Sequence, residues 1–259
     1  MLDFHKKHEF YNNNGFDLNA HWLFLAENGS VSQNLNTPES NHDFIGVVIP
    51  PMDYSLAPFH DEYQMPFKHW EWKDEDGYSE GKFYSLLRFA ELVLNGNPSV
   101  VSVLWNMPYH MQTHPHFNGF INKRHALVSY DTVRHCMGFA KNEVLQMQRV
   151  TKESSAKRVQ YVSRFGYYPK SAVAAIRMLK MSIELCNTGE LTVYRTGDRE
   201  QLMEIKRGEW QLSSVLQYYE ELNAELLDVG VGKVLREHVD KDVVRALVLD
   251  IYRRKYKCL

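Results

Sequence analysis

Short apolar runs and helical spacings divide this chain into predictable elements. Residues 20–27 and 43–49 are short apolar runs with aromatic or β-branched side chains, which is typical of buried strands. The segment between them is rich in Asn, Ser, Gly and Pro, so it predicts a loop. The apolar run at residues 99–105 predicts a third strand. The polar and aromatic segment at residues 61–81 predicts irregular structure or a hairpin.

Helical spacing dominates the rest of the chain. Apolar residues three and four positions apart predict a helix over residues 81–94, which ends before an Asn-Gly-Asn-Pro turn. The same spacing predicts helices over residues 129–151, 170–187, 198–207, 211–227 and 240–257. The pattern therefore predicts an α+β fold, with a sheet-containing domain over residues 1–120 and a mostly helical domain over residues 121–259.

Composition narrows the class of protein. The chain has 259 residues, of which 44% are hydrophobic, so a sizeable core can form. A formal net charge of −2 argues against a protein that coats nucleic acid, although it leaves room for a local basic groove. The cysteines are widely spaced and odd in number, which favours a reducing compartment over a disulfide framework. Because the chain shows no signal-peptide or membrane-spanning run, we expect a cytoplasmic protein without a membrane partner.

A polar motif connects the first two predicted strands. Gly29 and Ser30 follow the first strand, and Asn41 and Asp43 head the second. Alternate residues of a strand point to the same face, so Asn41 and Asp43 are expected to face one site. A Gly-Ser turn that opens a short helix offers backbone N–H groups and a hydroxyl to phosphates. Phosphoryl transfer needs carboxylates that hold magnesium, so this spacing would suit a nucleotide site with Asp43 at the metal, although the pattern by itself is a weak signal.

This arrangement resembles the DNA polymerase beta superfamily of nucleotidyltransferases. In that pattern a strand is followed by Gly-Ser, and after ten further residues an Asp-x-Asp motif begins the next strand. The stretch from Glu27 to Asp43 is similar to one branch, the predicted nucleotidyltransferases of bacteria and large phages associated with RNA repair. The blocks "LVLNGNPSVVSVLW" and "FGYYPKSAVAAIRMLKMSIELCNTGELTV" resemble that branch too, so the similarity covers most of the chain. It implies a nucleotidyltransferase-type mixed sheet flanked by helices, a nucleoside triphosphate as substrate or ligand, and Mg²⁺ as cofactor.

The sequence departs from the pattern of that branch at four positions. Asn41 stands where the first metal-binding acid is expected, and Ser102 aligns with the third acid. Asn34 replaces a Gly, and Ser171 replaces a residue that is often His. Only Asp43 of three carboxylates then remains, so we expect Mg²⁺ binding to be weak or absent. The nearby acids that could replace a missing ligand are Glu39, Glu27 and Asp53.

Two cations on the helix predicted at residues 170–187 are further candidates. Lys170 and Arg177 are seven residues apart, nearly two helical turns, so they are expected to share a face. The resemblance implies that both neutralise the polyphosphate of a nucleotide or contact a nucleic-acid backbone. The spacing by itself also fits a solvated helix face with ordinary ion pairs, for example to Glu184.

Two hypotheses about function follow from these features. In the first, the chain transfers a nucleoside monophosphate to an RNA or protein hydroxyl, with Asp43 and Asn41 as catalytic residues. In the second, it is a catalytically inactive module of phage or bacterial origin that binds a nucleotide, RNA or a partner protein.

Residues 155–170 interleave cations and aromatics, which fits a surface for single-stranded RNA or a tRNA end. They fit an amphipathic helix packed on the core equally well. His110 and its neighbouring histidines are expected in a polar loop.

Overall fold

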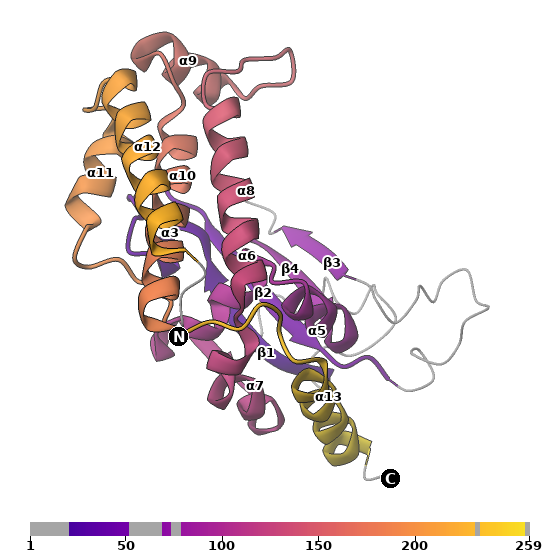
Figure 1. Ribbon diagram of the computed structural model, residues 1–259. Coiled ribbons are helices and arrows are strands. Elements are labelled where there is room, and N and C mark those ends of the chain that lie inside the picture. Colours follow the sequence, from indigo (N-terminus) through magenta and orange to yellow (C-terminus); the bar gives the residue numbers. More distant parts are fainter. Residues whose placement is uncertain (1–20, 52–68, 74–78, 231–233, 257–259) are drawn as a thin grey trace. The chain divides into compact units, whose positions relative to one another are not determined.

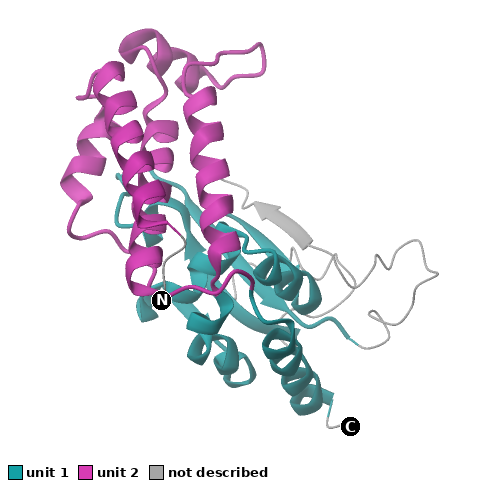
Figure 2. Cartoon of the chain, in the orientation of Figure 1, with its two compact units in different colours: residues 1–127, 239–259 teal, residues 128–238 magenta. Residues whose placement is uncertain are grey.

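The computed structural model describes residues 21–51, 69–73, 79–230 and 234–256 of the chain (Figure 1). The chain divides into two compact units (Figure 2): unit 1 comprises residues 1–127 and 239–259, and unit 2 comprises residues 128–238. None of the helices in these described ranges is long and apolar enough to cross a membrane.

The described residues of unit 1 form a mixed sheet of five strands in the order β3-β4-β2-β1-β5. The strands are β1 (Trp22–Asn28), β2 (His42–Val48), β3 (His69–Lys73), β4 (Ser79–Ser85) and β5 (Met111–Thr113). β1 is antiparallel to β2 and β5, β2 is parallel to β4, and β3 is antiparallel to β4. The predicted α+β class and the strands at residues 20–27 and 43–49 are thus confirmed. The β3–β4 pair is compatible with the predicted hairpin, whose residues 74–78 lie outside the described part.

Helices pack on this sheet to form the core of unit 1. They are α3 (Gly29–Ser32), α5 (Leu86–Leu94), α6 (Pro98–Ser102), η2 (Val103–Trp105), η3 (Pro108–His110), η4 (Pro115–Phe117), α7 (Asn118–Asn122), η5 (Arg124–Leu127) and α13 (Lys241–Tyr256). The ring of Phe117 stacks on Phe24 of β1 at 4.9 Å and on Phe120 of α7 at 4.9 Å. α13 adds Leu247 and Ile251 to this cluster of buried residues. The C-terminal helix therefore packs in unit 1, which differs from the sequence-based division at residue 120.

Unit 2 is a set of helices arranged around α10. Its helices are α8 (Tyr130–Gln146), α9 (Ala156–Phe165), α10 (Pro169–Thr188), α11 (Arg199–Arg207) and α12 (Leu212–Val229). Most residues of α10 are buried, since this helix packs against α8, α11 and α12. The helices predicted in this region are confirmed, although α8 ends at Gln146, before the predicted end at residue 151.

One prediction in unit 1 is wrong, and another is confirmed only in part. Residues 99–105 form α6 and η2 instead of a third strand. Asn97 caps α6, because its side-chain oxygen accepts hydrogen bonds from the N–H groups of Ser99 (3.1 Å) and Val100 (3.2 Å). Pro98 occupies the first helical position, which suits a proline. The helix predicted at residues 81–94 begins only at Leu86, since the preceding residues belong to β4.

We predict that Gly46→Ala lowers the free energy of unfolding by about 2 kcal/mol. A Cβ atom at Gly46 would overlap the ring of Phe83, its Cα partner on β4, which is 2% exposed. The matched control is Gly138→Ala in α8, where a Cβ atom meets no described atom within 4 Å. That change should stabilise the protein by up to about 1 kcal/mol. Chemical denaturation followed by circular dichroism measures both, and a Gly46→Ala protein as stable as the wild type would contradict the prediction.

Candidate functional site

Gly29 and Asp43 lie together at one end of the β1–β2 pair. β1 ends at Asn28, whose Cα partner on β2 is Asp43. Gly29 then turns the chain with φ +69°, in the left-handed region that favours glycine. A Cβ atom at this position would overlap Oδ2 of Asp43, so the carboxylate lies directly against the glycine backbone. The structure therefore brings together two of the residues that the sequence predicted for the site.

The loop from Ser30 to Asn41 is held by local hydrogen bonds. The carbonyl of Ser30 accepts a hydrogen bond from the N–H of Leu35 (2.9 Å), whose side chain is only 1% exposed. The N–H of Thr37 donates to Oγ of Ser40 (2.8 Å). Asn41 is exposed immediately before β2, two positions from Asp43. Buried Leu35 and the turn at Thr37–Ser40 therefore fix the path of the chain into the start of β2.

Asn34 is a conservative departure from the resembled pattern. Its φ of 60° lies in the left-handed region, where Asn is one of the best-tolerated residues after Gly. The replacement of Gly by Asn therefore preserves the backbone conformation of the loop.

Glu80 is a candidate that sequence reasoning missed. It lies on β4, which runs parallel to β2, and its Cα partner there is Asp43. Side chains of neighbouring residues on adjacent strands point to the same face of a sheet, so the sheet places these two acids side by side. Glu80 is exposed and Asp43 is half-buried. The sequence analysis missed Glu80 because it predicted a helix from residue 81, where the structure has strand β4. The change from polar Lys82 to apolar Phe83 was the available signal of a strand.

Ser102 does not occupy the position that the sequence alignment gave it. The third acid was expected on a strand beside Asp43, but Ser102 ends helix α6. Its hydroxyl donates a hydrogen bond to the carbonyl of Ser99 (3.4 Å). The absence of an acid at Ser102 therefore says little about the acids around Asp43.

Glu27 is part of a separate cluster on the opposite face of the sheet. Its Cα partner is Phe44, one residue from Asp43, and successive side chains alternate between faces. Glu27 is 7% exposed, and its carboxylate contacts Nδ1 of His42 (2.9 Å) and Nδ1 of His110. Glu27 is therefore engaged by two histidines and does not replace a ligand beside Asp43. Glu39 is exposed in the loop, and Asp53 lies outside the described residues.

Lys170 and Arg177 have different environments on α10 in unit 2. Lys170 is exposed in the first turn, whereas Arg177 is only 7% exposed. The Nη1 group of Arg177 donates to Sδ of Met181 (3.0 Å), and its buried Nε has no hydrogen-bond partner among the described residues. Burial lowers the pKa of Arg177 to about 10. The two cations therefore do not form one solvated helix face.

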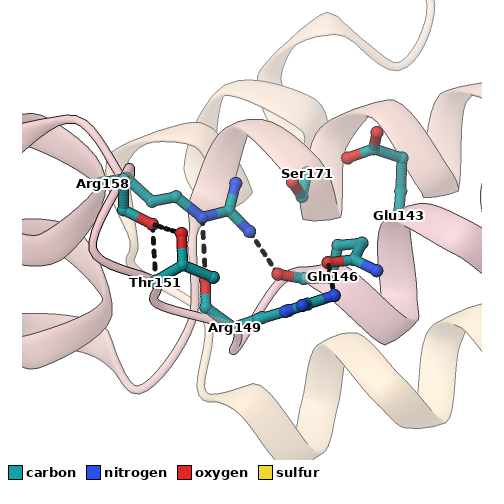
Figure 3. Close-up of a pocket in the computed structure, with 7 residues that line it drawn as sticks. Glu143, Gln146, Arg149, Thr151, Arg158 and Ser171 are labelled. Atoms are coloured by element: carbon teal, nitrogen blue, oxygen red, sulfur yellow. Dashed lines mark hydrogen bonds between the residues drawn. The ribbon is translucent and has the colours of Figure 1, made fainter.

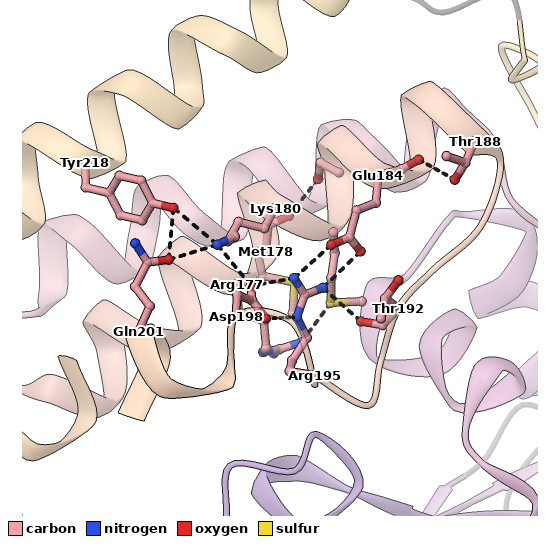
Figure 4. A network of polar contacts seen from close by, with 12 residues as sticks. Arg177, Met178, Lys180, Glu184, Thr188, Thr192, Arg195, Asp198, Gln201 and Tyr218 are labelled. Atoms are coloured by element: carbon pink, nitrogen blue, oxygen red, sulfur yellow. Dashed lines mark hydrogen bonds and ion pairs between the residues drawn. The ribbon is translucent and has the colours of Figure 1, made fainter. Parts of the chain in front are cut away.

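Glu184 pairs with Arg195 rather than with the candidate cations (Figure 4). The guanidinium of Arg195 also makes two hydrogen bonds to Asp198, of 2.8 and 2.6 Å. Lys180 donates to Asp198 (3.0 Å) and to the side chain of Gln201 (3.0 Å). This network ties the segment before α11 to α10, so the role of these charges is structural.

Comparisons with known proteins add no relative: no protein-family model matches the chain, and no curated protein matches it either. The described residues also contain no group of three or more His, Cys, Asp or Glu side chains placed to hold a metal ion. The chemistry of unit 1 therefore has to be inferred from the Asp43–Glu80 pair beside Gly29, and that of unit 2 is considered separately from its own cations.

We predict that Asp198→Asn destabilises the protein by about 2 kcal/mol at neutral pH. Burial raises the pKa of Asp198, but the hydrogen bonds and charges of Arg195 and Lys180 outweigh burial, so the net pKa is lowered. This stability is present above the unfolded pKa of about 4 and is lost as pH falls through the folded-state pKa. Asp198→Asn should therefore flatten the acid side of the stability profile, measured by urea denaturation from pH 2 to 7.

The control for this prediction is Asp250→Asn on α13. Asp250 pairs with Arg254 at 3.0 Å, but both side chains are about half exposed, at 46% and 57%. Such a pair contributes about 0.5 kcal/mol or less. Equal effects of the two substitutions at every pH would contradict a special role for the Asp198 network.

Proposed function

We propose that this chain is a nucleotidyltransferase-type protein that binds a nucleoside triphosphate with Mg²⁺ and transfers a nucleoside monophosphate to an RNA or protein hydroxyl. The observation that carries the proposal is the Asp43 carboxylate, which lies against Gly29 with Glu80 at the same level of the next strand. The resemblance of the Gly-Ser and Asp43 stretch to the DNA polymerase beta superfamily agrees with that arrangement.

The donor atoms at this site suit Mg²⁺. Asp43 and Glu80 offer carboxylate oxygens, and Asn41, two residues before Asp43 and just outside β2, offers an amide oxygen. Mg²⁺ is a hard cation that proteins commonly hold with one or two carboxylates together with substrate phosphates. When bound, the ion would neutralise the polyphosphate and stabilise charge that develops during transfer. With Glu80 counted, the site lacks one expected acid rather than two.

The other groups of the site act by positioning. Gly29 has no side chain, which leaves room for the Asp43 carboxylate to lie against the turn. The hydroxyl of Ser30 is a hydrogen-bond donor for a phosphate of the nucleotide. Asp43 and Glu80 hold the cation, and phosphoryl transfer depends mainly on such positioning and charge neutralisation.

The alternative is an inactive binding module that uses the same residues. Asn41 favours this alternative, because an amide brings no negative charge to a cation that an aspartate would bind more strongly. The two functions differ in one measurable step, the release of pyrophosphate with transfer of the labelled nucleotide.

Arg177 and Lys170 are proposed as further anion-binding residues. A guanidinium that is buried without a carboxylate partner is costly, and an anionic ligand would supply the missing interaction. The only hydrogen bond of Arg177 among the described residues goes to a methionine sulfur, which is a weak acceptor. Lys170 is exposed and would contribute as a point charge.

We predict that Asp43→Asn and Glu80→Gln each weaken binding of the Mg²⁺–triphosphate complex at least about tenfold, since each removes a carboxylate ligand. Asn41→Asp should strengthen it and raise any transfer of α-labelled nucleotide. Ser102→Glu is the control, because it adds the same charge on α6. Isothermal titration and a radiolabel transfer assay measure these effects. Wild-type affinity in both Asp43→Asn and Glu80→Gln would disprove the site, while binding without transfer would identify the inactive module.

We predict that Arg177→Met weakens nucleoside triphosphate binding about tenfold without lowering the stability of the protein by more than about 1 kcal/mol. Methionine keeps much of the buried volume but removes the charge. Lys180→Met on the same helix is the control: it breaks the contact with Asp198, so it should reduce stability and leave affinity unchanged. Calorimetric titration with thermal denaturation separates the two effects. Unchanged affinity of Arg177→Met would reject the phosphate role.

A further inference from the structure

A second candidate binding surface lies on α9 and the first turn of α10 in unit 2. Residues 154–183 contain six Lys or Arg and no Asp or Glu, in a chain whose net charge is −2. None of the residues of α9 is buried, so side chains around the whole helix reach the surface. We call this region the α9 surface, and its residues are Lys157, Arg158, Tyr161, Arg164, Phe165, Tyr168 and Lys170.

Aromatic rings of the α9 surface form a connected group. Tyr161 lies 5.8 Å from Phe165 and 6.1 Å from Tyr168, measured between ring centroids. All three rings are half-buried, so each keeps an accessible part. Partly exposed aromatic rings that lie near one another are groups on which bases of a single strand can stack.

Each of these rings is paired with a cation. The amino group of Lys157 lies 5.8 Å from the ring centroid of Tyr161, and the guanidinium of Arg158 lies 4.7 Å from that of Tyr168. Arg164 lies 5.0 Å from the ring centroid of Phe165. Cation and ring are thus presented together, which suits a ligand with alternating flat groups and negative charges.

A polar pocket of about 330 Å³ adjoins α9 (Figure 3). Arg149 and Arg158 line it together with the hydroxyl groups of Thr151 and Ser171, and Glu143 is the acid in its wall. Arg158 is held in place, since its Nε donates to the carbonyl of Arg149 (3.0 Å) and its Nη2 to the carbonyl of Gln146. The pocket therefore combines an oriented guanidinium with hydroxyl donors, which suits a phosphate or sugar.

Positive charge converges beside the α9 surface. Burial and the charges of Lys170, Lys157 and Arg199 lower the pKa of Lys206 on α11. Cations of three helices are therefore close enough to repel one another. A polyanion bound across them would relieve that repulsion.

We propose that the α9 surface binds single-stranded nucleic acid, with its cations on the phosphates and its aromatic rings on unstacked bases. A duplex keeps its bases stacked, so it offers the rings no free base faces. An acidic peptide would engage the cations but has no flat groups for the aromatic row. This function goes beyond the proposed nucleotide site and does not rest on it, because binding is measured without any nucleoside triphosphate.

The test is fluorescence anisotropy of the full chain with a labelled oligonucleotide of about 15 nucleotides, as RNA, as DNA and as a duplex. We expect the single strands to bind more tightly than the duplex. Tyr161→Leu should weaken binding about fivefold or more. Lys157→Gln with Lys170→Gln should reduce the slope of log affinity against log salt by about 1.4, since each lysine that neutralises a phosphate contributes about 0.7.

Matched controls keep this test decisive. Lys141→Gln removes an exposed lysine from α8 of the same unit, and Tyr109→Leu removes a tyrosine that is 63% exposed in unit 1. Both should bind like the wild type. The proposal is overturned if single strands do not bind at low salt, if the duplex binds equally well, if polyglutamate competes as strongly as RNA, or if the variants of the α9 surface match the controls.

Discussion

The close approach of the Asp43 carboxylate to the backbone of Gly29 is the constraint on which the candidate site depends. β1 and β2 are antiparallel neighbours with Asn28 opposite Asp43, so the chain must leave β1 where the carboxylate of β2 points. Only a residue without a side chain fits that turn, and Gly29 adopts the left-handed conformation that it requires. The parallel register of β2 and β4 then adds Glu80 to the same face.

Buried arginines in unit 2 show how the same side chain serves different purposes. Arg195 is 3% exposed and has two carboxylates around it, so its charge is compensated within the fold. Arg177 is buried to a similar extent, but its hydrogen bonding within the described residues stops at a methionine sulfur. A buried charge that keeps its carboxylate partners costs less than a buried charge without one. This contrast separates the structural network around Arg195 from Arg177, which we propose as an anion-binding residue.

The net charge of the chain does not show how its charged side chains are distributed, and this distribution is what the two proposals use. The formal net charge of −2 argues against general binding to nucleic acid, yet residues 154–183 carry only positive side chains among their charged residues. Asp43 and Glu80, which are paired on neighbouring strands of unit 1, suit a divalent cation, and the cations of the α9 surface suit phosphates. Each proposal therefore follows from the local charges that the fold collects, and not from the net charge of the chain.

The sequence by itself determined the elements with a strong local signal. The apolar runs of β1 and β2 and the helical spacing of α8, α10, α11 and α12 were readable because periodicity reports the face that each element buries. The tertiary structure decided the rest. Residues 99–105 are apolar and β-branched like a strand, but the fold buries Val100, Val103 and Leu104 in the core of unit 1 as parts of helices. β4 pairs with β2 although the two strands are far apart in the sequence, so no local pattern indicates that Glu80 lies beside Asp43. The burial of Arg177 likewise depends on the helices packed around α10, which no spacing along one helix can report.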